Sequence, residues 1–448
     1  MRRDTKHKYE KLDFLAWFLP GLEIKRWLFL MFGGTVFLIL GSAILLDLHP
    51  VHQFVEMIQH IAIKVPTNYT GGVALFTGVM IYVLGWKRLN NTIIDALDPG
   101  AHLLDNLYLK RKLNRGPKII TIGGGTGLNT ILKGLKHITG NLTAVVTVGD
   151  DGGSSGRLRE EMGVLPPGDI RNCIAALANE ENLVTELFQY RFKTGHGLEG
   201  HSFGNLFLTA LCAITGDMVS AVKESSKVLS IRGRVLPSTL DDMKLFAEME
   251  DGRVIYGESN IPEAGGKIKR LGATPDNLKA LDDVIYAVEE ADIIIMGPGS
   301  LYTSVIPNLL ISEITEAISR STAKKIYICN IMTQPGETDE YTVYDHVKAI
   351  LDHSKHDNII DTVLVNDNLP HNLAVKYKEA NAFPVRHDLN KVKELGINVL
   401  IRRLTEVNTD GYLRHSAKRI TRIINSWYKG SNRHSNDENY EYPENDDD

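Results

Sequence analysis

The stretch KIITIGGGTGLNTILKGL, residues 118–135, decides the fold. An apolar run typical of a buried strand leads into a turn that holds four glycines, and a helical pattern follows from Leu128. Glycine lets the backbone turn with a positive φ and lets a ligand approach without meeting a Cβ. The start of the following helix favours an anion, because its first N–H groups have no partner within the helix. We expect phosphate binding here, with a turn that holds no ligand as the alternative; the residues concerned are Gly123, Gly124, Gly125, Thr126 and Gly127.

The spacing of these glycines excludes two common cofactor motifs. It reads GxGxG, which is close to the GxGxxG of dinucleotide-binding turns but differs from it. It is not a phosphate-binding loop of the Walker A type either, because no Gly-Lys-Ser/Thr follows. We therefore expect neither a nicotinamide nor a flavin cofactor.

Four further runs of β-branched residues end in turn residues and lead into helical patterns. They begin at Thr143, Ala291, Lys324 and Thr362. Near-continuous apolar strands are typical of a parallel sheet covered by helices on both faces. The sequence therefore predicts an α/β protein with a doubly wound, Rossmann-like, three-layer domain. Ligands of such sheets bind at the carboxyl ends of the strands, and polar residues and glycines recur at those ends here.

Two adjacent carboxylates, Asp150 and Asp151, follow the second strand in VGDDGGSSGRLRE. Asp150 stands where an acidic residue of Rossmann-type sites meets a ribose. The pair could instead hold Mg²⁺ beside ligand phosphates. The GGSSG that follows predicts a flexible loop over the site, from which Arg157 and Arg159 would reach phosphate or carboxylate oxygens. A solvated surface loop is the alternative.

Two motifs, PPGDIRN and GHSFGN, place polar residues at the starts of helices. Helix capping alone would explain Asp169 and Ser202. His201 fits an acid or base, or a structural histidine held by hydrogen bonds. The candidate binding residues of these motifs are Asp169, Arg171, Asn172, His201, Ser202 and Asn205.

Two later strands end in GPGSLYTS and NIMTQPGET. Ser300 can cap a helix or bind an anion, and Tyr302 could stack on a base or a sugar. With six polar strand ends around one crevice, the sequence predicts a large, polar ligand that carries phosphate. The candidates here are Gly299, Ser300, Tyr302, Asn330 and Thr333, with Gln334 and Glu337 beside them.

The composition excludes several classes of protein. A formal charge of −5 over 448 residues, with no basic stripe, argues against nucleic-acid binding. Three cysteines that are far apart argue against a zinc site or a disulfide framework and indicate a reducing compartment.

Two apolar runs lie near the N-terminus, at residues 27–46 and 71–86. The first carries no charge and is long enough to cross a bilayer, whereas the second needs its flanks. Basic residues flank the pair on its outer sides and the connection carries only Lys64, so both ends face the cytoplasm. We predict a transmembrane helical hairpin in the cytoplasmic membrane, with the main domain in the cytoplasm; a buried core hairpin is the alternative.

These observations divide the chain into five parts. They are a basic cytoplasmic N-terminus (1–26), the hairpin (27–88), a connector helix (89–115), a nucleotide-binding domain (116–428) and a disordered acidic tail (429–448).

Taken together, GGGTGL, VGDDGGSSGRLR, PPGDIRN, GHSFGNLFLTAL, GPGSLYTS and NIMTQPGET resemble the CofD-like superfamily, in its YvcK or gluconeogenesis-factor branch. The resemblance covers residues 116–425. It implies binding of a UDP-sugar such as UDP-N-acetylglucosamine and a link to gluconeogenic growth, cell shape and cell-wall synthesis. CofD transferases instead use Mg²⁺ and a guanosine diphosphate donor to modify a deazaflavin. Their glycine turn is of the GGTGGAKL kind, and the departure from it here argues against that activity.

Two hypotheses follow. In the first, a membrane-tethered regulatory protein binds a UDP-sugar and acts on cell-wall synthesis proteins. The glycine turn and Ser300 would hold the diphosphate, Asp150 or Asp169 would bind hydroxyls, and Asn205 and Tyr302 would read the base or sugar. In the second, Asp150 and Asp151 hold Mg²⁺ for a CofD-like transferase of a phosphorus-containing group. The sequence assigns no catalytic residue and leaves a homo-oligomer open.

Overall fold

The structure is a computed structural model that describes residues 34, 52–57, 76–77, 79–81, 84, 111–178, 182–367, 381–407 and 413–434. The chain splits into two compact units, Met1–Lys112 and Leu113–Asp448, and each is described by itself. Most of the hairpin predicted at 27–88 lies outside the described residues, and so do most of the connector and residues 435–448 of the tail. Among the described residues, no single helix has the length and apolar character to span a membrane; the pair Phe203–Thr215 and Met218–Val228, bent by 120°, meets these criteria only jointly.

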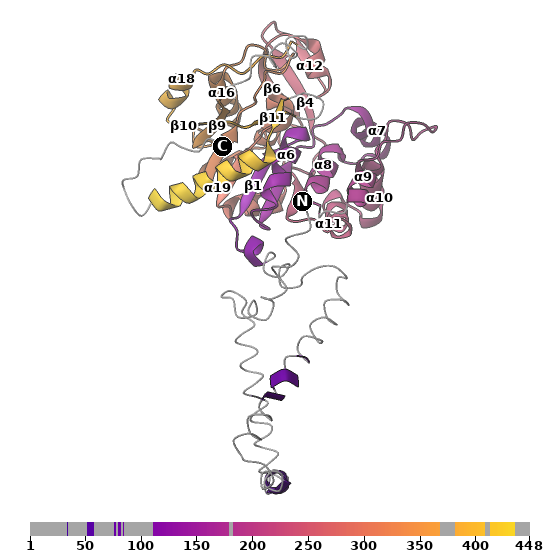
Figure 1. The fold of residues 1–448 in the computed structure, drawn as a ribbon. Helices are drawn as coiled ribbons and strands as arrows, with labels where there is room; N and C mark the ends of the chain where they lie inside the picture. Colours follow the sequence, from indigo (N-terminus) through magenta and orange to yellow (C-terminus); the bar gives the residue numbers. More distant parts are fainter. Residues whose placement is uncertain are drawn as a thin grey trace. The chain divides into compact units, whose positions relative to one another are not determined.

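The second unit is built on one sheet of seven parallel strands (Figure 1). The strands are β1 (Ile119–Gly123), β2 (Leu142–Val146), β3 (Arg234–Pro237), β7 (Ile293–Met296), β8 (Lys324–Ile328), β9 (Thr362–Asn366) and β10 (Asn398–Arg402). Every residue of β1, β2, β7 and β9 is buried. The predicted parallel sheet and its five predicted strands are therefore confirmed.

The strand order places a topological switch point beside the glycine turn. Across the sheet the order is β10-β9-β8-β7-β1-β2-β3. The chain therefore runs from β1 towards β3 on one side and from β7 towards β10 on the other. Because crossovers between parallel strands are right-handed, helices that follow the two series cover opposite faces of the sheet. The turns after β1 and β7 lie next to each other where the order reverses, which is where ligands of doubly wound sheets bind.

Helices connect and cover the strands. They are α6 (Gly125–Leu135), α7 (Gly153–Met162), α8 (Gly168–Leu177), α9 (Asn182–Gln189), α10 (Phe203–Thr215), α11 (Met218–Val228), α13 (Asp282–Glu289), α14 (Ile306–Leu309), α15 (Ser312–Arg320), α16 (Val343–Ser354), α18 (Leu389–Glu394) and α19 (Ala417–His434). A π-helix, η1 (Leu301–Val305), precedes α14. Helix α19 continues past residue 428, the predicted end of the domain.

Two local predictions are wrong. The GGSSG segment is not a flexible loop, because α7 begins at Gly153 and Ser154, Ser155 and Gly156 are buried within it. Gly168 of α8 lets Ser155 approach closely, since a Cβ on Gly168 would lie 2.3 Å from the Ser155 hydroxyl. Helix α6 begins at Gly125, three residues before the position that the helical pattern indicates.

A small antiparallel sheet is inserted between β3 and β7. It consists of β4 (Lys244–Met249), β5 (Val254–Tyr256) and β6 (Ile268–Thr274), with α12 (Asn260–Ala264) between β5 and β6. A Cβ on Gly336, in the segment after β8, would lie 2.0 Å from the carbonyl oxygen of Pro262 in α12. Helix α12 of the inserted segment thus lies in direct backbone contact with the segment that follows β8. Strands β11 (Thr405–Val407) and β12 (Leu413–His415) form a separate ribbon.

Candidate functional site

A pocket of about 270 Å³ lies at the switch point. Four groups of residues line it: the glycine turn at 124–127, Thr147 and Asp150 after β2, Asp169 of α8, and Gly299, Ser300, Thr303 and Ser304 after β7. Glu258, between β5 and α12, completes the wall. The structure thus brings together eight of the binding residues that the sequence predicts: Gly124, Gly125, Thr126, Gly127, Asp150, Asp169, Gly299 and Ser300.

The glycine turn is held by a carboxylate of the protein. Gly125, with a φ of +63°, begins α6 and donates its N–H to Asp169 Oδ2 over 2.8 Å. A Cβ on Gly124 would lie 2.5 Å from the same oxygen, and one on Gly127 would lie 2.3 Å from the carbonyl oxygen of Pro298. Only glycine allows these approaches. Because Asp169 already accepts the first N–H of the helix, an anionic ligand here would bind to the other N–H groups of the turn.

The turn after β7 supplies hydroxyl groups. Ser300 precedes η1, and its hydroxyl accepts a 2.6 Å hydrogen bond from Gln334 Nε2. Asn308 in α14 donates its side-chain amide to the carbonyl oxygens of Gly123 (3.3 Å) and Ser304 (2.9 Å). This amide therefore joins the end of β1 to η1 and fixes the two walls of the pocket relative to each other.

Carboxylates give the pocket a negative character. Burial raises the pKa of Asp169 to about 6, and the nearby charge of Asp150 adds to the effect. Burial is the largest cause that raises the pKa of Glu258 to about 8, and the charges of Asp150 and Asp151 add to the effect. A phosphate would be repelled by ionised forms of these groups unless a cation or protons intervened.

The residues present fit a divalent cation of the magnesium type only in part. Asp150 and Asp169 line the pocket with carboxylate oxygens, which Mg²⁺ prefers together with phosphate oxygens and water. The side chain of Asp151 instead accepts the N–H groups of Glu258 (2.8 Å) and Ser259 (2.9 Å). Across the described segments, no group of three or more His, Cys, Asp or Glu side chains is arranged to hold a metal ion. An ion here would thus need oxygens of the ligand to complete its coordination.

A second polar cluster lies behind the pocket wall and does not line the pocket. His201 Nδ1 and Ser154 Oγ lie 2.9 Å apart, and Asn205 donates its amide to Ser154 Oγ over 3.0 Å. Arg171 hydrogen bonds the Ser202 hydroxyl, and donates to Asn172 Oδ1 over 2.8 Å. The candidates from PPGDIRN and GHSFGN, apart from Asp169, therefore form a group of their own.

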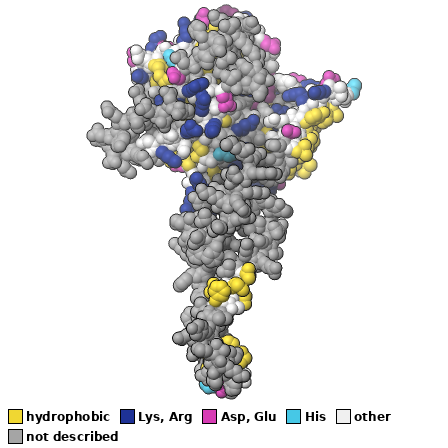
Figure 2. Space-filling model, viewed as in Figure 1, with side chains coloured by type: hydrophobic (Ala, Val, Ile, Leu, Met, Phe, Trp, Pro, Cys, Tyr) yellow, Lys and Arg dark blue, Asp and Glu magenta, His cyan; other side chains and the backbone are white. Residues whose placement is uncertain are grey.

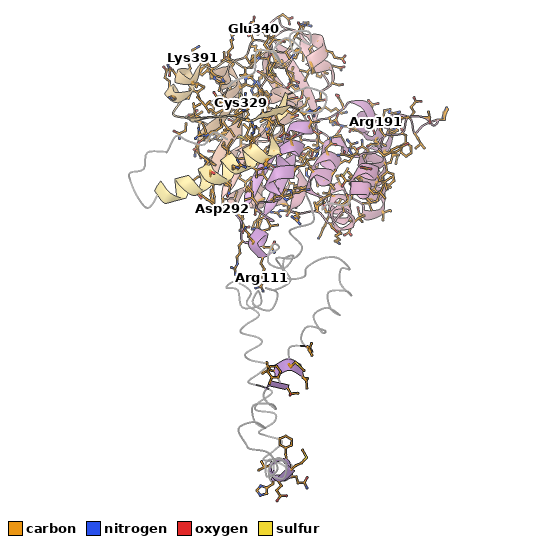
Figure 3. The ribbon with its side chains drawn as sticks, in the orientation of Figure 1. Arg111, Arg191, Asp292, Cys329, Glu340 and Lys391 are labelled. Carbon is orange, nitrogen blue, oxygen red and sulfur yellow. The ribbon has the colours of Figure 1, made fainter. Side chains whose placement is uncertain are left out.

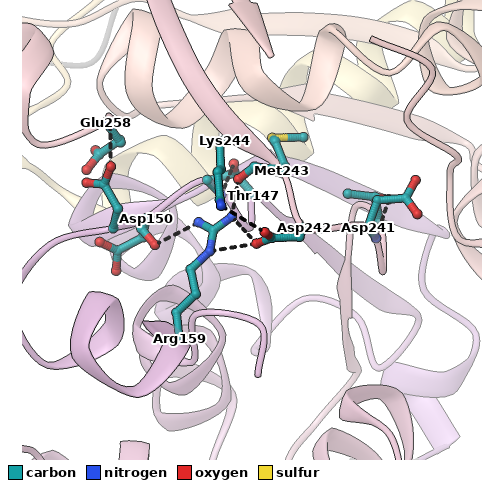
Figure 4. Close-up of polar contacts among 11 residues, drawn as sticks. Thr147, Asp150, Arg159, Asp241, Asp242, Met243, Lys244 and Glu258 are labelled. Atoms are coloured by element: carbon teal, nitrogen blue, oxygen red, sulfur yellow. Dashed lines mark hydrogen bonds and ion pairs between the residues drawn. The ribbon is translucent and has the colours of Figure 1, made fainter. Parts of the chain in front are cut away.

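Arg159 does not reach the pocket. Its guanidinium group bonds Asp242 and the carbonyl oxygens of Met243 and Asp150 (Figure 4). The arginine therefore ties α7 to the start of β4. Arg157 donates to the carbonyl oxygen of Glu199 over 2.7 Å.

Three other candidates lie apart from the pocket. Tyr302 is buried, and its hydroxyl lies 2.8 Å from that of Tyr341. Thr333 exchanges hydrogen bonds with the backbone of Phe383. Neither these side chains nor Asn330 lines the pocket.

Comparison with known proteins agrees with this architecture. The sequence profile of the CofD family, described as 2-phospho-L-lactate transferase CofD, matches residues 119–405. The chain belongs to the CofD family. A protein of Nostoc sp. (strain PCC 7120) is 49% identical over 437 residues, which cover 96% of this chain and 95% of that protein. The protein named gluconeogenesis factor of Bacillus subtilis (strain 168) is 50% identical over 313 residues, 70% of this chain and 98% of its own.

A solved structure extends the likeness to three dimensions. The crystal structure of a Bacillus halodurans protein has a TM-score of 0.67 and 48% identity, and the match covers 69% of this chain and 99% of that one. The relatives named gluconeogenesis factor confirm the branch of the CofD family that the sequence motifs indicate.

Sequence reasoning missed four residues that line the pocket of this CofD domain: Thr147, Glu258, Thr303 and Ser304. Thr147 follows β2 directly, and Thr303 and Ser304 stand in the quoted motif GPGSLYTS, so the rule of strand ends could have found them. Glu258 follows β5, a strand of three residues in the inserted sheet. No pattern in the sequence connects that strand to the carboxyl ends of the large sheet.

Proposed function

We propose that this CofD-family protein is a regulatory protein that binds a UDP-sugar of the UDP-N-acetylglucosamine type and links its supply to gluconeogenic growth, cell shape and cell-wall synthesis. The observation that carries the proposal is the pair of glycine-containing turns at the switch point, which face one pocket. The turns after β1 and β7 offer backbone groups and three hydroxyls, Ser300, Thr303 and Ser304, to a diphosphate.

The carboxylates define how the ligand would be held. Asp150 and Asp169 are suited to Mg²⁺, which would neutralise the diphosphate when bound, or to the hydroxyls of a ribose or sugar. Asp169 also holds the turn itself through the Gly125 N–H. The same side chain would thus sense a ligand and set the shape of its binding loop.

Two glycines with the same backbone conformation provide a matched test. Gly125 has a φ of +63° and a Cβ there would lie 3.4 Å from Ser304 Oγ, within the pocket. Gly163 has a φ of +66°, and a Cβ there would meet nothing within 4 Å. Alanine brings the same backbone strain at both sites, but only Gly125→Ala adds an atom between the walls of the pocket.

The assay is isothermal titration of the full-length protein in mild detergent. The ligands are UDP-N-acetylglucosamine, UDP-glucose, UDP and GDP, each with and without Mg²⁺. We expect UDP-sugars to bind without turnover, Gly125→Ala to weaken them at least tenfold, and Gly163→Ala to leave them unchanged. Equal affinities in both variants would exclude the pocket as the nucleotide site.

A transferase is the second candidate, and the carboxylates of the pocket favour it. In this case Asp150 and Asp169 would position a Mg²⁺ ion, which supplies charge neutralisation of a phosphorus-containing leaving group. Preference for GDP in the titration, or slow consumption of a GDP-linked donor that is lost in Asp150→Asn, would support a CofD-like transferase over a binding protein.

The membrane tether is a separate part of the proposal, and it rests on the apolar runs within residues 27–88. We expect the full chain in the membrane fraction of cells and a chain without residues 1–90 in the soluble fraction. A deletion variant that stayed with the membranes would show that another segment anchors the protein.

A further inference from the structure

The arginines behind the pocket wall converge on one short segment. Arg157 comes from α7, Arg171 from α8, and Arg191 from the strand-like bridge that pairs it with Ser202. Arg157 donates to the carbonyl oxygen of Glu199, Arg191 to that of Gly200, and Arg171 to the Ser202 hydroxyl. Three guanidinium groups from three elements therefore surround residues 199–202. Figure 3 labels Arg191 on the part of the molecule that holds α7 to α10.

Among the residues that the structure describes, no ion pair neutralises the positive charge of these arginines. Within the described parts of the chain, no carboxylate lies within ion-pair distance of Arg157, Arg171 or Arg191. The acceptors that their guanidinium groups reach in the described segments are neutral. Other arginines of the domain, such as Arg159 and Arg253, do pair with aspartates. The three guanidinium groups thus form a cationic cluster.

One donor of the cluster lacks a partner. Arg171 is only 9% exposed, and its Nε atom has no hydrogen-bond acceptor. The Oδ1 atom of the buried Asn205 also lacks a donor. A buried guanidinium donor without an acceptor is unfavourable, because it has lost its hydrogen bond to water and gained none within the protein. Burial and the charge of Arg191 both lower the pKa of Arg171. An anion beside Arg171 would satisfy the donor and offset this charge.

We propose that Arg157, Arg171 and Arg191 form an anion subsite, separate from the glycine-turn pocket, that binds the phosphate group of a second small molecule or free phosphate. Two of the arginines are exposed, so that solvent reaches the subsite, while the third forms its inner end. Planar guanidinium groups bind phosphate in a bidentate manner. In the glycine-turn pocket Asp150 and Asp169 would repel an anion that brings no cation with it, whereas the three arginines attract one.

The position of the subsite couples it electrostatically to the glycine-turn pocket. Arg171 lies two residues after Asp169 in the first turns of α8, and the charges of Asp169 and Asp150 act on it. An anion bound to Arg171 would therefore change the electrostatic environment of Asp169, the carboxylate that holds the glycine turn. This inference does not depend on which nucleotide, if any, binds in the pocket. In Figure 2, Lys and Arg side chains are scattered over this face of the second unit, including the part formed by α7 to α11.

The test is isothermal titration of the full-length protein in mild detergent with inorganic phosphate and with glycerol 3-phosphate, at constant ionic strength. The variants are Arg157→Gln, Arg191→Gln and their combination. These side chains are exposed, so we expect the variants to fold, and their thermal unfolding is measured in parallel. Arg253→Gln is the matched control, because Arg253 is exposed and also donates to backbone carbonyl oxygens, those of Ala264 and Gly265.

We expect phosphate to bind the wild type, each single variant to weaken it about tenfold, and the control to bind like the wild type. Tighter binding of glycerol 3-phosphate than of phosphate would identify a phosphorylated metabolite as the ligand, and the reverse would identify free phosphate. Gly125→Ala should retain phosphate binding. Absence of phosphate binding, or binding that Gly125→Ala abolishes and the double arginine variant retains, would overturn the proposal. Failure of UDP-sugars to bind while phosphate binds would remove the proposed function and leave this subsite standing.

Discussion

The substitution Glu258→Gln tests the electrostatics of the pocket most directly. Burial and the neighbouring carboxylates, Asp150 first, raise the pKa of Glu258 to about 8 from its ordinary 4.5. Between these values the folded protein holds a proton on Glu258 that the unfolded chain releases, so stability falls as pH rises from 4.5 to 8. Glutamine has nearly the same shape and cannot ionise. The variant should therefore lose this pH dependence.

The magnitude follows from the shift. Each pKa unit corresponds to about 1.36 kcal/mol, so a shift from 4.5 to about 8 sets an upper limit of ~5 kcal/mol for the destabilisation above pH 8. At pH 5 less than ~1 kcal/mol of it is present, because this pH is only about half a unit above the ordinary pKa of 4.5, where the loss of stability begins. Since 1 kcal/mol moves the Tm of a domain of this size by roughly 2 °C, Glu258→Gln should raise the Tm by about 4–10 °C at pH 8.5 and by less than about 2 °C at pH 5.

The assay is thermal unfolding of the wild type and variant at pH 5 and 8.5, with a chelator present to remove divalent cations. Glu289→Gln on the exposed end of α13 is the control, because it makes the same chemical change away from the pocket. A gain in Tm that is the same at both pH values, or a loss at pH 8.5, would refute the argument that ionised carboxylates crowd this pocket.

Two further substitutions separate close packing from ligand contact. Gly124→Ala would place a Cβ 2.5 Å from Asp169 Oδ2 and 2.8 Å from Thr147 Cγ2, so we expect a loss of about 1–3 kcal/mol in the free energy of unfolding by denaturant titration. Tyr302→Phe removes the hydroxyl that bonds Tyr341, which should lower stability by about 1 kcal/mol and leave UDP-sugar affinity unchanged in a titration.

Each of these two predictions has its own contrary outcome. Gly152→Ala is the control for the first, because Gly152 also precedes a helix with an extended backbone (φ −89°) and a Cβ there would come no closer than 3.5 Å to a neighbouring atom. If Gly124→Ala were no less stable than Gly152→Ala, the turn could open without loss. A tenfold fall in UDP-sugar affinity in Tyr302→Phe would restore the role in base or sugar recognition that the sequence suggests for Tyr302.

The interior of the sheet could be predicted from the sequence, and its margins could not. Central strands such as β1 (IITIG) and β7 (IIIM) are buried on both faces, so isoleucine dominates their composition. Strand β3 has four residues, which include an arginine and a proline, and β10 is only partly buried. Edge strands need less apolar surface and leave a weaker pattern.

The candidate site divides in the same way. The glycine turn, Asp150, Asp169 and Ser300 were found because each follows a predicted strand or starts a predicted helix. Glu258 reaches the pocket only through the inserted sheet, which tertiary packing alone places. The pattern of α7 does not predict a helix because glycine and serine disfavour helices in isolation; the folded domain overrides this preference by burying Ser154, Ser155 and Gly156.

The width of the pocket depends on the close contact between Gly336 and Pro262, which is possible because glycine has only a hydrogen atom as its side chain. Any other residue at position 336 would place its Cβ 2.0 Å from the carbonyl oxygen of Pro262. A larger side chain would act as a wedge and push α12, and with it the segment that carries Glu258, outward from the strand ends. A substitution at position 336 would therefore widen the opening of the pocket without changing any residue that lines it.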